Sequence, residues 1–140
     1  MALGIAASPA SAAAVVPQLV GQDATCDTVV PGDFTIALPD VVQNGMTVIT
    51  GSSPTATLTT TTNASNQLSF DIDRDYAVRA VIVFKGGEPT GSGNAYVYSA
   101  SSVPPFPRGI AADTGLTTPI PGQTIDAVTF CLVPDPYNQP

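Results

Sequence analysis

Apolar and polar residues alternate with a period of two along most of the chain, the pattern of half-buried β-strands. The segment Leu68–Asp73 reads LSFDID and so places three apolar side chains on one face and three polar ones on the other. No window of helical length carries a 3.6-residue period free of proline and glycine. The pattern predicts about seven strands: Phe34–Leu38, Met46–Thr50, Ala56–Thr62, Leu68–Ile72, Ala77–Phe84, Asn94–Ser99 and Thr124–Val133.

Two of these segments differ from the rest. Ala77–Phe84 is almost continuously apolar, which predicts a central strand covered on both faces. Arg79 interrupts it and must therefore point toward an edge or find a carboxylate partner. Ala56–Thr62 is rich in threonine, which favours a half-buried or exposed strand. Short strands separated by turn residues indicate an all-β fold, and we expect one antiparallel β-sandwich over residues 17–140.

Composition narrows the class of protein. The 140 residues carry a net charge of −7, with four basic and eleven acidic side chains and no histidine. Hydrophobic residues make up 44% of the chain, which is enough apolar material to bury a core and excludes a disordered chain. The acidic balance argues against a nucleic-acid partner, which requires a basic surface. The lack of histidine excludes imidazole as a base, proton shuttle or metal ligand.

The N-terminal residues 1–16 resemble the end of a secretory signal peptide. They are small or apolar and uncharged, and Ala10-Ser11-Ala12 fits an A-x-A cleavage site. A flexible alanine-rich N-terminus is the alternative, and either interpretation places these residues outside the fold core. No later segment has about 18 uninterrupted apolar residues, so we expect no membrane span. The resemblance to a signal peptide leads us to expect a secreted, extracellular location.

Cys26 and Cys131 are the two cysteines of the chain. In an exported chain an even count predicts a disulfide, here one that closes almost the whole domain. A pair of free buried thiols is the alternative. Zinc coordination is disfavoured because a zinc site needs several clustered Cys and His ligands.

Asp71, Asp73 and Asp75 form a D-x-D-x-D pattern that would place three carboxylates on one strand face. Such oxygen ligands suit Ca²⁺, although the spacing lacks the glycine and glutamate of an EF-hand loop. The alternative, which we favour, is a solvated acidic strand edge that prevents pairing with other sheets. We therefore expect no cofactor, with Ca²⁺ as the one metal to test.

Tyr96 and Tyr98 share one face of a predicted strand, and Phe106 follows after two prolines. An exposed aromatic pair of this kind can bind carbohydrate or a protein partner. The alternative, again the one we favour, is that the rings cover the edge of the sandwich.

No constellation of residues predicts catalysis. A nucleophilic Ser, Thr or Cys needs a base beside it, and Lys85 is the single lysine, without an S-x-x-K motif. Glu88 is the single glutamate, and nothing marks a carboxylate pair. We expect the protein not to be an enzyme.

The C-terminal half carries a series of motifs in order. They are Val81-Ile82-Val83-Phe84-Lys85-Gly86-Gly87, Ala95-Tyr96-Val97-Tyr98, Asp113-Thr114-Gly115-Leu116 with Pro119, and Ile125-Asp126-Ala127-Val128-Thr129-Phe130-Cys131. This series resembles a family of secreted domains of actinobacteria and other Gram-positive bacteria with the pattern V-I-V-K-G-G…Y-x-Y…D-T-G-L-x-x-P…I-S-H-V-x-F-C. An early T-C dipeptide supplies the other cysteine in that family, and Thr25-Cys26 fits its place.

The resemblance implies an extracellular module of cell-surface proteins without enzymatic activity. We therefore expect a secreted structural or adhesive surface module. Two alternatives stay open: a subunit of an extracellular homopolymeric assembly, and a module that binds carbohydrate or protein through Tyr96 and Tyr98, with Ca²⁺ on Asp71, Asp73 and Asp75. Asp113 is expected to form an Asx-turn in a long loop.

Overall fold

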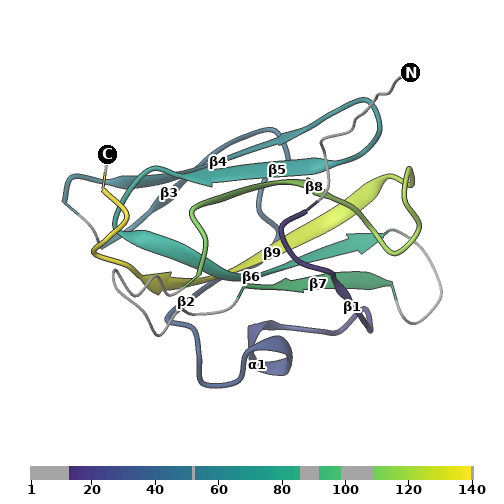
Figure 1. Ribbon diagram of the computed structural model, residues 1–140, viewed down its shortest axis with the longest axis horizontal. Helices are drawn as coiled ribbons and strands as arrows, with labels where there is room; N and C mark the ends of the chain where they lie inside the picture. Colours follow the sequence, from purple (N-terminus) through teal and green to yellow (C-terminus); the bar gives the residue numbers. More distant parts are fainter. Residues whose placement is uncertain (1–12, 52, 86–91, 99–108, 140) are drawn as a thin grey trace, which may run out of the picture.

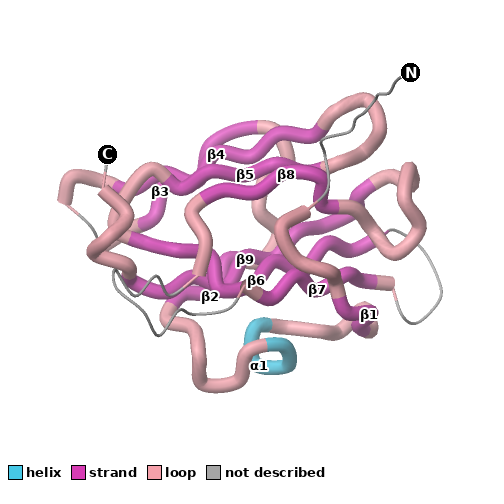
Figure 2. The backbone as a smooth tube through the Cα atoms, in the orientation of Figure 1, coloured by secondary structure: helices cyan, strands magenta, loops and turns pink. Residues whose placement is uncertain are grey.

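The computed structural model describes residues 13–51, 53–85, 92–98 and 109–139. Two antiparallel sheets pack face to face and form a β-sandwich, as predicted (Figures 1 and 2). The elements are β1 (Gln18–Val20), α1 (Cys26–Val29), β2 (Ile36–Leu38), β3 (Gly45–Ile49), β4 (Ala56–Thr62), β5 (Leu68–Ile72), β6 (Tyr76–Lys85), β7 (Gly93–Val97), β8 (Ala112–Leu116) and β9 (Ile125–Pro134).

The five-stranded sheet has the order β1-β7-β6-β9-β2, with β6 at its centre. The apolar run that predicted a central strand is therefore correctly placed. Eight of its ten residues are buried. One face meets the other sheet, and on the opposite face Ala80 lies under α1 and Val30. β6 pairs with β9 along nearly its whole length, and the register shifts between Val78 and Ala80.

The four-stranded sheet has the order β3-β4-β5-β8. On β4 the buried positions alternate with threonines that are exposed or half-buried, which confirms the half-buried strand expected from its sequence. The inward positions Ala56, Leu58 and Thr60 pack beneath this sheet. β3 and β8 form the two edges.

The core lies between the two sheets. Its largest fully buried side chains are Ile49, Leu58, Leu68, Ile72, Val78, Val81, Val83, Leu116, Val128, Phe130 and Leu132. Phe70 joins this core through edge-to-face contacts with Phe130 and Tyr98, at ring-centroid distances of 5.2 and 6.1 Å. Such aromatic contacts add to the free energy gained from burial.

The short helix α1 lies on the outer side of the five-stranded sheet, away from the second sheet (Figure 1). Cys26 and Val30 pack there against Ala80 and Cys131 in a second, smaller core. Just beyond this helix, Asp33 accepts from the Arg79 guanidinium at 2.8 Å. Arg79, the cation that interrupts the apolar run, thus has the carboxylate partner that the sequence led us to expect.

Three segments differ from the sequence prediction. β1 and α1 were not predicted, and the D-T-G-L segment forms β8 instead of a loop. The Asp113 carboxylate accepts from the backbone N–H of Thr114 at 2.8 Å, not from an amide two residues on. Gly115 has φ +76° and lies next to a register shift between β5 and β8. Asp and Gly are typical of turns, so this irregular strand was predicted as a loop.

The exclusion of residues 1–16 from the core is wrong for residues 13–15. Ala13 and Val15 pack against the main core. The backbone N–H of Ala14 donates to both carboxylate oxygens of Asp113, at 3.0 and 3.1 Å. Residues 1–12 lie outside the described part of the chain, as do Gly86 and Gly87 of the motif series, Glu88, Ser99 and Phe106.

Candidate functional site

Cys26 and Cys131 form the predicted disulfide, with their Cα atoms 5.7 Å apart. On β9, Val128, Phe130 and Leu132 point into the main core, so the side chain of Cys131 emerges on the opposite face, below α1. Cys26 is the first residue of α1, where the backbone N–H of Thr25 donates to the Thr28 hydroxyl at 3.2 Å. The bridge therefore fixes the segment between β1 and β2 on the outer face of the five-stranded sheet.

Tyr96 and Tyr98 do share one face of their strand, but that face is the inner one. Their exposed fractions are 2% and 3%, so the hypothesis that they form an exposed binding pair is wrong. The Tyr96 hydroxyl accepts from the backbone N–H of Thr117 at 2.9 Å and donates to its carbonyl at 3.3 Å. Tyr96 thus holds the loop after β8, and Tyr98 holds the edge strand β8 through Asp113, so both rings cover the edge of the sandwich as in the alternative interpretation.

Tyr98 belongs to a buried polar network. Its hydroxyl donates to the Asp113 carboxylate at 2.7 Å, and that carboxylate also accepts from Ala14 and Thr114. Burial raises the pKa of Tyr98 far above its ordinary value, and the hydrogen bond to Asp113 and its negative charge raise it further. The network ties the N-terminal residues to β7 and β8.

Asp71, Asp73 and Asp75 do not share a strand face, so the predicted three-carboxylate face is wrong. β5 ends at Ile72, and Asp75 takes the left-handed conformation with φ +68°. The Asp73 carboxylate accepts from the backbone N–H of Thr57 at 2.9 Å, and that of Asp75 from the Gln139 side chain at 2.9 Å. Within the described residues, no three acidic or cysteine side chains converge on a point that would hold a metal ion.

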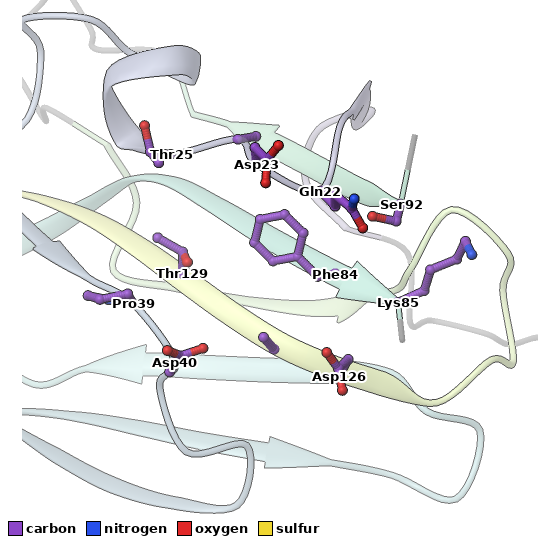
Figure 3. Close-up of a pocket in the computed structure, with 12 residues that line it drawn as sticks. Gln22, Asp23, Thr25, Pro39, Asp40, Phe84, Lys85, Ser92, Asp126 and Thr129 are labelled. Carbon is purple, nitrogen blue, oxygen red and sulfur yellow. The ribbon is translucent and has the colours of Figure 1, made fainter. Parts of the chain in front are cut away.

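An open cleft of about 570 Å³ lies on the outer face of the five-stranded sheet (Figure 3). The segment 22–25 before α1 forms one wall, and Pro39 and Asp40 after β2 form the other. Phe84 and Lys85 of β6 and the β9 residues Asp126, Ala127 and Thr129 contribute the floor. This volume is in the range of small-molecule sites, so the cleft is the candidate functional site.

The Phe84 ring occupies the middle of the cleft (Figure 3). It is half-buried and lies against Gly93, where an added Cβ would come within 3.0 Å of the ring. Gly93 is the cross-strand partner of Phe84, so the missing side chain leaves room for the ring to lie over the sheet.

Polar groups surround this ring. Asp23 lies on one side of Phe84, and Asp40 and Asp126 lie on the other (Figure 3). All three aspartates are exposed. The hydroxyl of Ser92 lines the cleft beside Gln22, although it is almost completely shielded from solvent and has no hydrogen-bond partner.

No pattern in the sequence predicted this cleft. Its residues come from five separate segments that only the strand order and the disulfide bring together. One signal was present: Phe84 extends an apolar strand at an outward position, two residues from Ile82, where a soluble two-layer sandwich has no second sheet to cover it.

Compared with protein-family models, curated proteins and solved structures, the chain matches none of them. No helix in the described part of the chain is long and apolar enough to cross a membrane.

Proposed function

We propose that the chain is a secreted, non-enzymatic adhesive module of a cell surface and that it binds through the open cleft. The observation that carries this proposal is the disulfide, which holds one wall of the cleft on the sheet. Disulfides that join distant elements persist in oxidising compartments, and this bridge ties α1 to β9 across 105 residues. A preformed wall lowers the entropic cost of binding, which favours an adhesive role.

Two further features support a binding role over catalysis. The buried ionisable groups Tyr98 and Asp113 are hydrogen-bonded to each other and to backbone amides, which is a structural use. The cleft has acidic, hydroxyl and aromatic groups but no histidine, cysteine or second lysine to activate a nucleophile. The resemblance of the motifs after residue 80 to a family of surface modules agrees with this function.

The test is cosedimentation of the purified chain with insoluble cell-wall glycan. We expect the chain to pellet with the glycan and to release no reducing ends from it. Phe84→Leu should reduce the pelleted fraction, whereas Asp71→Asn on the other sheet should not. A chain that stays in the supernatant at low and high salt would contradict the proposal.

A second candidate function, subunit of a homopolymeric assembly, is favoured by the edge strand β3. Met46 and Val48 are 66% and 60% exposed on this strand, and no residue from 41 to 51 is charged. An uncharged apolar edge is able to pair with another chain. Light scattering during size-exclusion chromatography tests it: oligomers that Val48→Lys dissociates would support this function, and a monomer would exclude it.

A further inference from the structure

The cleft has an excess of negative charge around its aromatic floor. The carboxylates of Asp23, Asp40 and Asp126 face it with one lysine, Lys85. None of the three aspartates takes part in an ion pair or side-chain hydrogen bond within the described residues, where the one ion pair is Arg79–Asp33. Carboxylates without partners repel an anionic ligand and attract a cation.

A bare metal ion does not match this arrangement. Asp23 lies on one side of the Phe84 ring and the other two aspartates on the opposite side (Figure 3). Within the described residues, they do not form a cluster that could hold a metal ion. Calcium would require six to eight oxygen ligands around one point. A ligand that contacts Asp23 on one side of the ring and Asp40 or Asp126 on the other must therefore be an extended molecule that crosses the ring.

Phe84 adds a preference for a flat ligand. Its ring is half-buried and fixed against Gly93, so it offers one face to the cleft. An aromatic face attracts cations through its quadrupole and packs against apolar C–H surfaces. A sugar ring with a positive charge provides both.

The Ser92 hydroxyl is an independent sign of a ligand. The residue is 1% exposed, its oxygen has no hydrogen-bond partner, and Figure 3 shows that oxygen directed toward Gln22 on the cleft side. A buried hydroxyl without a partner destabilises the folded protein, so natural proteins rarely retain one. A hydroxyl-bearing ligand in the cleft would supply the missing hydrogen bond.

We infer that the cleft binds an amino sugar with a free ammonium group, presented as a unit of a glycan chain. In this arrangement the sugar ring stacks on Phe84, its ammonium pairs with the carboxylates of Asp40 and Asp126, and its hydroxyls bond with Ser92 and Asp23. The inference rests on the proposed adhesive function and names the ligand class of the same cleft.

The experiment is an NMR titration of the full chain with a β-1,4-linked glucosamine tetrasaccharide. The matched probe is its fully N-acetylated counterpart, which has the same rings without the charge. The titration is run at mildly acidic pH, where the amines of the probe are protonated. We expect amide shifts at Phe84, Ser92 and Asp126, and binding of the free-amine probe at least tenfold tighter, weakened by added salt.

Variants locate the binding. Asp126→Asn and Asp40→Asn should each weaken binding of the free-amine probe about threefold or more, because each removes one charge. Asp40 has φ +54°, a conformation that asparagine also adopts readily, so this variant preserves the fold. Phe84→Leu should weaken both probes about tenfold. Asp71→Asn, exposed on the other sheet, is the control and should change nothing.

Equal affinity for the two probes, or no binding of the free-amine probe at millimolar concentration, would overturn the inference. An equal loss in Asp71→Asn and Asp126→Asn would do the same. If the chain still pellets with cell-wall glycan in such a case, the adhesive function survives and only the ligand class is wrong.

Discussion

At the scale of single residues, the face of the strand decides the role of each side chain. Tyr96 and Tyr98 point inward and serve structure, whereas Phe84, on the neighbouring strand, points outward and lies in the cleft. The period-two pattern correctly predicted that the tyrosines share a face, but periodicity alone does not say which face is covered. Arg79 was more informative, because a cation within an apolar run requires a partner and has one.

The hydrogen bond between Tyr98 and Asp113 predicts a pH dependence of stability. The pKa of Tyr98 is raised in the folded protein, so its neutral hydroxyl contributes fully below pH 10.0, the ordinary pKa of tyrosine. Above that pH the unfolded chain loses the proton and the folded chain keeps it, so the free energy of unfolding decreases. The limiting slope for one proton is about 1.4 kcal/mol per pH unit.

Urea denaturation from neutral pH to pH about 11 tests this dependence. In Tyr98→Phe the free energy of unfolding should decrease less steeply with pH above pH 10.0, by the contribution of one proton. Tyr137→Phe is the matched control, because Tyr137 is 57% exposed and its loss should leave the slope unchanged. An unchanged slope in Tyr98→Phe would contradict the assignment.

Burial along β6 predicts a contrast between two substitutions. Ile82 is fully buried at the centre of the five-stranded sheet, so Ile82→Ala should lower the free energy of unfolding by about 2–5 kcal/mol. Thr59 lies on the exposed face of β4, and Thr59→Ala should cost less than about 1 kcal/mol. Urea denaturation of the two variants gives both values, and equal losses would show that the central strand is misplaced.

At the scale of elements, the sequence predicted the strands that alternate clearly and missed those that do not. Each of the seven predicted segments overlaps a strand of the structure, and two of them match its bounds. β1 is three residues long, α1 is four, and β8 contains the turn-forming Asp113 and Gly115. Elements of three or four residues have no period to detect, and the turn-forming residues conceal the period of β8. These elements form because the core or the disulfide holds them.

The cleft was beyond prediction for a related reason. Its walls are loops, and its residues come together through the strand order β1-β7-β6-β9-β2. Apart from the consecutive strands β6 and β7, neighbours in that order are far apart in the sequence, and no local pattern encodes their pairing.

The N-terminal residues 13–15 give a prediction at this scale. They pack against the core and donate a hydrogen bond to Asp113, whose carboxylate is buried. A chain that begins at Pro17 should therefore be less stable than one that begins at Ala13, by about 1–3 kcal/mol for the lost hydrogen bond to a charged group. Thermal unfolding of the two chains measures the difference. Equal melting temperatures would show that residues 13–15 contribute nothing to the fold.

At the scale of the whole molecule, the bridge between Cys26 and Cys131 joins the outer layer to the sandwich. It closes a loop of 105 residues, for which chain-entropy estimates give a stabilisation of about 4–5 kcal/mol. It also holds the 22–25 segment that forms a wall of the cleft. The stability of the fold and the position of the proposed binding surface therefore depend on the same covalent bond.

Loss of the bridge should reduce both the stability of the fold and the binding at the cleft. Cys131→Ala should lower the free energy of unfolding by a few kcal/mol, a large share of the ~5–15 kcal/mol typical of a domain. It should also weaken glycan binding at temperatures where the variant is still folded, because the wall is no longer anchored. Urea denaturation and cosedimentation of this variant provide both values. Full stability in the variant would contradict the proposed role of the bridge.

Non-reducing peptide mapping of the native protein tests the central role of the disulfide most directly. After alkylation without reduction and proteolysis, we expect one linked peptide pair containing Cys26 and Cys131 and no alkylated cysteine. Reduction before alkylation should convert the pair into two labelled peptides. Two labelled cysteines in the unreduced native protein would contradict the disulfide, and with it the anchored cleft wall and the extracellular assignment.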